Sequence, residues 1–199
     1  MSVAQAVLSR VKRMPKGRPF ARVLLAPLGS RASVGKALSR LVQSGTLERV
    51  ARGVYMRPKQ SKYTGKNVRP SPLAVMKVVT RMRGETIQIH GAEAARRLGL
   101  STQMQVLPIF YTSGFTREFK IGNAVVRLQH VPKDRLQQAG TKVGVALTAL
   151  HYIGKEGLSP KVIFKIVSTL SNEELMKLKA CKMPEWMRMA LSVAVKGVE

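Results

Sequence analysis

The sequence has few acidic residues and almost no cysteine. Asp and Glu number 10 against 35 Lys and Arg, a formal net charge of +25. Such an excess indicates a polyanionic partner, such as nucleic acid or an acidic protein. The single cysteine, Cys181, excludes an internal disulfide and has no second cysteine with which to hold zinc. We therefore expect neither redox nor metal chemistry, and no cofactor.

Long hydrophobic runs are also missing. No stretch approaches the roughly eighteen apolar residues that a membrane-spanning helix needs. The N-terminus lacks the basic start, apolar middle and small-residue cleavage site of a signal peptide. We therefore expect no membrane partner and a cytoplasmic protein. With 199 residues, 45% of them hydrophobic, the chain is long enough for one generous globular domain or two small ones.

Charge is unevenly distributed along the chain. Residues 1–70 hold sixteen Lys or Arg and one acid, Glu48, whereas the remainder holds nineteen bases and nine acids. This asymmetry is typical of a protein in which one domain binds a phosphate backbone. Residues 58–70 lack apolar periodicity and are rich in Gly, Pro and polar residues, as linkers are. The predicted division is a DNA-binding domain over 1–60, a linker over 61–70 and a second domain over 71–199.

Hydrophobic periodicity predicts three helices in the first 45 residues. The first ends before Pro15. A short second helix is expected through Phe20 and Leu25. Ser30 caps a third helix, which ends at Gly45. The apolar residues expected to bury one face of the first and third helices are Val3, Val7, Leu8, Val11, Val34, Leu38, Leu41 and Val42.

The next segment predicts a hairpin. Residues 46–57 contain two short β-prone runs on either side of Ala51-Arg52-Gly53, which has the composition of a tight turn. Three helices followed by a basic hairpin is the element order of a winged helix-turn-helix domain, whose third helix enters the major groove of DNA. We therefore interpret the hairpin as the wing.

This interpretation assigns candidate DNA-binding residues. Arg31, Ser33 and Lys36 fall on the first turns of the third helix, where side chains can reach base edges. At Ser30, the backbone amides at the start of the third helix are expected to face a phosphate of the DNA backbone. The basic residues assigned to phosphate or the minor groove are Arg40, Arg49, Arg52 and Arg57.

A basic helix face can simply be solvated. A solvated face normally mixes charges of both signs, whereas here the helix, turn and hairpin are basic together. DNA binding is therefore the preferred interpretation, and a winged helix that binds only protein is the alternative.

The pattern beyond residue 70 predicts a mixed domain. Ser71-Pro72 begins a helix that ends near Gly84. Strands are expected over 86–90, 106–112, 115–121 and 124–130, with a short helix over 92–98. The last three strands are expected to form an antiparallel meander with turns at Ser113-Gly114 and Gly122-Asn123. A helical tail follows, with helices over 142–153, from Ser159-Pro160, and from a capping box at Ser171. Because strands and helices do not alternate, the predicted fold class is α+β.

Nothing in the sequence predicts catalysis. The spacing of His90, His130 and His151 along the chain fits no set of metal ligands. A histidine at the end of a strand is usually structural. No paired carboxylates and no GxxxxGK phosphate loop are present. We therefore expect that the chain is not an enzyme.

Two further segments stand out together. The first is Gly29-Ser-Arg-Ala-Ser-Val-Gly-Lys-Ala-Leu-Ser-Arg-Leu-Val with Gly45-Thr-Leu-Glu-Arg-Val-Ala-Arg-Gly-Val-Tyr55. The second is His90-Gly-Ala-Glu-Ala-Ala-Arg-Arg-Leu-Gly-Leu-Ser-Thr-Gln103. They resemble the AbiEi-type antitoxins of type IV toxin-antitoxin (abortive infection) systems. The resemblance extends to residues 111–114, 120–123 and 184–188.

That family pairs an N-terminal winged helix-turn-helix with a C-terminal antitoxin domain. Its members neutralise a cognate nucleotidyltransferase toxin of the AbiEii kind and repress their own operon. The resemblance therefore implies two partners, double-stranded operator DNA and such a toxin.

The second segment also fits a short helix packed on the sheet through its alanines and Leu98. Arg96 and Arg97 are its exposed members, and they are candidates for contact with an acidic toxin or with more DNA.

The leading hypothesis is a DNA-binding antitoxin that represses its own operon. The alternative is a transcription factor whose second domain senses a small ligand or mediates dimerisation. RNA binding is disfavoured because the chain has five Phe and one Trp and no interleaving of basic with aromatic residues. The oligomeric state is open, and a monomer that binds DNA cooperatively is one option.

Overall fold

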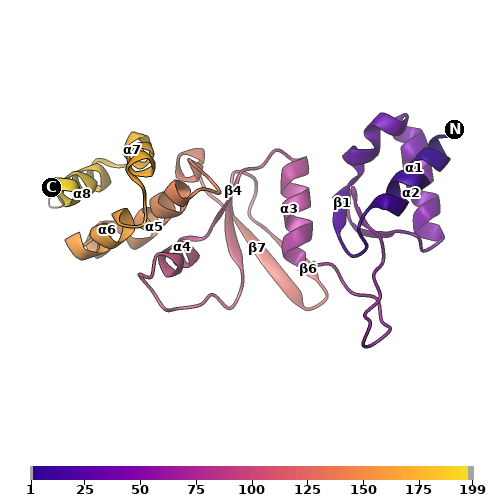
Figure 1. The fold of residues 1–199 in the computed structure, drawn as a ribbon, viewed down its shortest axis with the longest axis horizontal. Helices are drawn as coiled ribbons and strands as arrows, with labels where there is room; N and C mark the ends of the chain where they lie inside the picture. The colour runs from indigo at the N-terminus through magenta and orange to yellow at the C-terminus, as the bar shows by residue number, and fades with distance from the viewer. Residues whose placement is uncertain (1, 197–199) are drawn as a thin grey trace. The chain divides into compact units, whose positions relative to one another are not determined.

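The computed structural model describes residues 2–196 and separates into two compact units (Figure 1). The N-terminal unit comprises residues up to 84 together with 119–126. The C-terminal unit comprises residues 85–118 and those from 127 onward. Helices and two separate sheets make up the structure, so the predicted α+β class is confirmed.

The N-terminal unit combines helices with a three-stranded antiparallel sheet of order β1-β3-β2. Its elements are α1 (Val3–Arg13), β1 (Pro19–Ala21), the 3-10 helix η1 (Arg22–Leu28), α2 (Arg31–Gln43), β2 (Glu48–Ala51), β3 (Val54–Met56) and α3 (Pro72–Met82). A turn at Arg52 and Gly53 joins β2 to β3, and Gly53 has a φ of 76° that suits glycine.

Local signals explain α1 and α2. Ser2 and Gln5 form a capping box at the start of α1. The Ser30 side chain caps α2, and Gly45, with a φ of 69°, follows its end. The predicted first and third helices are confirmed. Their buried faces meet in one hydrophobic core, which contains Val7, Val11, Phe20, Leu25, Val34, Ala37, Leu38 and Leu47.

The prediction of the second helix is wrong in the type of helix and in its first residue. Phe20 lies in strand β1, where it pairs with Tyr55 of β3. The helix that follows is a 3-10 helix with Pro27 inside it. Its Leu25 is buried, whereas Val23 and Leu24 are 61% and 56% exposed. The pairing with β3 is a long-range contact, which local periodicity cannot report.

Residues 58–70, predicted as part of a linker, turn back on themselves. Val68 N–H donates to the Lys59 carbonyl at 2.7 Å, and Ser61 N–H donates to the Lys66 carbonyl at 2.9 Å. Helix α3 then belongs to the N-terminal unit. Its Val75 and Val79 form a small core with Val54 of β3.

The C-terminal unit holds most of the second sheet and the remaining helices. Its elements are β4 (Ile87–Ile89), α4 (Gly91–Arg97), β5 (Ile109–Thr112), the 3-10 helix η2 (Lys133–Leu136), α5 (Lys142–Gly157), α6 (Pro160–Val167), α7 (Asn172–Ala180) and α8 (Glu185–Lys196). Strands β6 (Arg117–Ile121) and β7 (Ala124–His130) form a hairpin whose tip, residues 119–126, falls in the N-terminal unit.

The expected meander is wrong. The sheet order is β4-β5-β7-β6, and β5 pairs with β7 in parallel rather than with β6. Strand β7 lies between β5 and β6, and its Val126 and Leu128 are 3% and 0% exposed. A partly buried ion pair of 2.6 Å between Arg117 and Glu85 holds the start of β6 close to the start of β4. The turn at Gly122 is the predicted hairpin turn, whereas Ser113-Gly114 is not one.

The predicted helical tail is confirmed. Ser159 and Ser171 cap α6 and α7 with their side chains, and Glu174 completes the capping box of α7. Helix α5 is bent at Gly154, whose φ is 71°. Large buried side chains from α5 to α8 form the largest core, among them Leu147, Leu150, Ile166, Leu178, Met187 and Leu191. Within residues 2–196, no helix is both long and apolar enough to cross a bilayer.

A glycine allows α4 to approach α5 closely, which gives a test of the packing. A Cβ at Gly91 would lie 2.3 Å from Tyr152 Cβ, whereas a Cβ at Gly35 of α2 would meet nothing within 4 Å. We expect Gly91→Ala to lower the free energy of unfolding by about 1–3 kcal/mol through overpacking. Gly35→Ala is the matched control, and it should raise stability by up to about 1 kcal/mol because alanine favours helix. Thermal denaturation checks both; an unchanged midpoint for Gly91→Ala would contradict the packing.

Candidate nucleic-acid interface

The N-terminal turns of α2 present polar side chains to solvent. Arg31, Ser33 and Lys36 are exposed, and the opposite face of the helix buries Val34 and Leu38. The spacing that predicted a buried stripe and a basic face is therefore confirmed for this helix.

The two serines at the start of α2 serve the helix itself. Ser30 Oγ accepts a hydrogen bond from Ser33 N–H at 3.2 Å, and the two hydroxyl oxygens lie 2.9 Å apart. This cap keeps the first turn of α2 in place and so fixes where Arg31 is presented.

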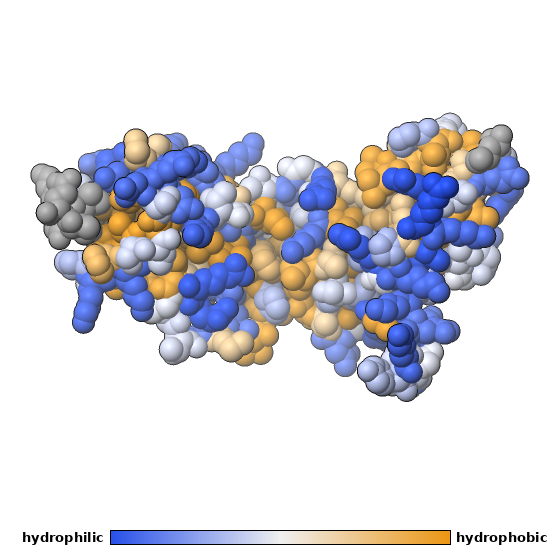
Figure 2. All heavy atoms as spheres, viewed as in Figure 1, coloured by the Kyte–Doolittle hydropathy of each residue, from blue (hydrophilic) through white to orange (hydrophobic). Residues whose placement is uncertain are grey.

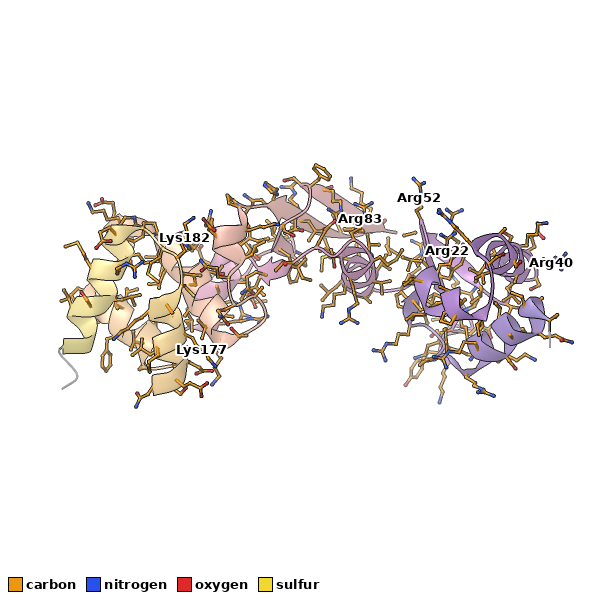
Figure 3. All side chains as sticks on the ribbon, turned by 90° about the horizontal axis from the view of Figure 1, so that it is seen from above. Arg22, Arg40, Arg52, Arg83, Lys177 and Lys182 are labelled. Atoms are coloured by element: carbon orange, nitrogen blue, oxygen red, sulfur yellow. The ribbon has the colours of Figure 1, made fainter. Side chains whose placement is uncertain are left out.

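The assigned basic residues of α2 and the sheet fall into two groups. Arg40, Arg49 and Arg52 are exposed. Arg57 is half-buried, and its Nη1 donates to the carbonyls of Lys12 and Met14 at 2.6 and 2.7 Å. Those carbonyls belong to the end of α1, so Arg57 ties α1 to β3 and is less available for phosphate. In Figure 3, Arg40 and Arg52 project from different sides of the N-terminal unit.

Positive charge dominates this unit. Glu48 is the one acid among residues 1–84, and it is exposed at the start of β2. Figure 2 shows hydrophilic side chains over much of the visible surface of this unit. A surface with so little internal compensation attracts polyanions over a Debye length, about 10 Å at 0.1 M salt.

Arg96 and Arg97, the candidates for toxin contact, share one carboxylate. Arg96 binds Glu93 through Nε and Nη2 at 2.8 and 2.9 Å, and Arg97 binds it through Nε at 2.8 Å. The hydrogen bond from Arg96 is the main cause that lowers the pKa of Glu93 to about 2. Both guanidinium groups are partly exposed, and they line an open hollow with Ile89, Met104, Gln105, Pro108, Ile109 and Phe110.

His90 has a structural environment. Its Nδ1 accepts a hydrogen bond from Ala92 N–H at 3.2 Å and so caps α4, and it lies 2.8 Å from Gln105 Nε2. The ring packs against Tyr111 and Tyr152. Burial, and then the positive charge of Arg135, lower the pKa of His90, and the same two causes lower the pKa of His151. Among the residues that the structure describes, no three His, Cys, Asp or Glu side chains are grouped as a metal site would need.

A protein-family model matches most of the chain. Residues 6–178 match the model described as a family of unknown function, DUF6088. The chain belongs to the DUF6088 family. No curated protein matches this DUF6088 member.

One similar solved structure is the crystal structure of the RV2827C protein from Mycobacterium tuberculosis. Its sequence identity to this DUF6088 chain is 13%, the match covers 94% of this chain and 79% of that one, and the TM-score is 0.37. A similarity at this level supports no conclusion about fold or function.

The histidines of this DUF6088 protein predict how its stability depends on pH. The folded-state pKa values of His90 and His151 lie below the ordinary 6.5, so the unfolded chain binds protons more readily. Stability should be complete above about pH 6.5 and should fall as the pH drops towards the folded-state values. Urea denaturation at pH 7.5 and 5.5 measures this loss, which should shrink in the His90→Gln/His151→Gln double variant. An equal loss in the double variant would assign the pH dependence to other groups.

Proposed function

We propose that this protein binds double-stranded DNA through its N-terminal unit. In this proposal α1, η1 and α2 are the helices of a winged helix-turn-helix, the β2–β3 hairpin is the wing, and α2 is the recognition helix. The observation that carries it is the capped first turn of α2, which exposes Arg31, Ser33 and Lys36 while its other face is fixed in the core. Base edges in the major groove are read by side chains in this position of such a helix.

We further propose that the protein is an antitoxin that represses its own operon and neutralises a nucleotidyltransferase toxin. The support is the resemblance of residues 29–55 and 90–103 to AbiEi-type antitoxins. In the second segment, Arg96 and Arg97 are held beside Glu93 in a defined, partly exposed geometry, which suits recognition of a protein surface. A transcription factor with a ligand-sensing second domain is the alternative, and the hollow beside α4 favours it.

The DNA-binding proposal predicts two kinds of variant. Arg31→Ala and Lys36→Ala should each weaken binding to the preferred duplex by about 1–3 kcal/mol and change the base preference, because these residues would contact base edges. Arg52→Ala should weaken binding to all sequences alike and reduce the salt slope by about one, as loss of one phosphate contact does. Selection from a random duplex library followed by fluorescence anisotropy provides the measurement.

A matched control for charge is Lys161→Ala, which removes an exposed base from α6. It should leave affinity close to wild type. Equal affinity and equal preference in all four variants would contradict binding through α2 and the wing.

The antitoxin proposal predicts growth rescue. We expect a nucleotidyltransferase to be encoded beside this gene; its expression should arrest growth, and co-expression of the full chain should restore it. Arg31→Ala should keep the rescue and lose repression of the operon promoter, because the two activities would reside in different units. An Arg96→Ala/Arg97→Ala variant should lose rescue and keep repression. If the wild-type chain gives no rescue while it still represses the promoter, the transcription-factor alternative is favoured.

A further inference from the structure

The turn between β2 and β3 is in contact with two other segments of the N-terminal unit. Arg22 N–H, at the start of η1, donates to the Gly53 carbonyl at 2.9 Å. A Cβ placed on Gly53 would lie 3.0 Å from Met82 Cε, so the last turn of α3 lies against this turn. The core formed by Val75, Val79 and Val54 holds α3 there.

This arrangement brings the turn that carries Arg52 close to the end of α3, which carries Arg81. Arg52 and Arg81 are exposed, and Arg22 is half-buried. Lys77 is exposed one turn before Arg81, and residues four apart share one face of a helix. Figure 3 shows the Arg52 side chain projecting away from the ribbon of this unit.

The helix dipole explains only part of this cluster. A cation in the last turn of a helix is stabilised by the partial negative charge there, and this suffices for Arg81. It does not explain Lys77 in the middle of α3, nor Arg52 on the turn. The sequence from 49 to 84 contains ten Lys or Arg and no acid, so no carboxylate within that stretch neutralises these groups. Among the residues that the structure describes, Arg52, Lys77 and Arg81 form no ion pair, so their charge is available to an external anion.

We propose that Arg52, Lys77 and Arg81 form one phosphate-binding surface, so that the DNA contact continues from the β2–β3 turn along the exposed face of α3. This inference rests on the proposed DNA binding and extends it to a helix outside the three-helix-and-hairpin motif. Its role is affinity without base specificity, because single cations that meet phosphate carry no sequence information.

The test uses the full chain and a charge-matched pair of double variants. Lys77→Gln/Arg81→Gln removes the α3 cations. Lys62→Gln/Lys66→Gln removes two exposed cations from the 58–70 segment, which leaves β3 at the end opposite to the Arg52 turn. Binding constants are measured from 0.1 to 0.6 M salt on a fluorescein-labelled duplex selected by the wild-type chain and on a scrambled duplex of equal length.

The α3 variant should reduce the slope of log K against log salt by nearly two and should weaken both duplexes about tenfold or more at 0.15 M salt. The control pair should lower the slope by less than half as much. Circular dichroism and the thermal midpoint of each variant establish that it is folded.

Two results would overturn the inference while leaving DNA binding through α2 intact. One is a wild-type slope in the α3 variant, and the other is an equal loss in the control pair, which would mean that only overall charge matters. A changed base preference in the α3 variant would overturn the phosphate assignment. If the wild-type chain selects no duplex from the random library but does bind an acidic protein, the proposed function itself fails, and the surface belongs to a protein partner.

Discussion

Uncompensated positive charge is the constraint on which the N-terminal unit depends. Residues 1–84 hold nineteen Lys or Arg and only Glu48 as an acid, so the folded unit keeps like charges close together. The apolar core around Leu25 and Leu38 must offset this repulsion, and it does so by joining α1, η1, α2 and the sheet. A bound polyanion would relieve the same repulsion. Stability and ligand binding are therefore linked in this unit, because a ligand that binds only the folded state stabilises it.

In the C-terminal unit, several carboxylates pair with neighbouring cations. Glu93 pairs with Arg96 and Arg97, and Glu85 pairs with Arg117. The Glu85–Arg117 pair is partly buried, and Glu85 also accepts a hydrogen bond from Thr112 Oγ1 at 3.1 Å. The two units therefore differ in electrostatic character, as the uneven charge of the sequence indicated. This difference supports the proposal that the N-terminal unit binds DNA and the C-terminal unit binds a second partner.

Local signals in the sequence were sufficient for most helices and for the turn at Gly53. Serine caps and hydrophobic spacing lie within a few residues of the element they specify, so α2 and the capped helices of the tail could be predicted. Strand β1 could not, because Pro19–Ala21 is a strand only through pairing with Met56 and its neighbours. The parallel pairing of β5 with β7 is likewise a long-range contact, which local pattern cannot report. The contact of Met82 with Gly53 is also long-range. Local pattern therefore could not predict it, nor the basic surface that we propose on α3.

The most direct test of DNA binding through α2 is a crystal structure of the full chain with its selected duplex. We expect the first turns of α2 to lie in the major groove, with Arg31 and Lys36 at base edges and Arg52 at the backbone. A complex in which α2 faces solvent, with the DNA on another surface, would contradict it.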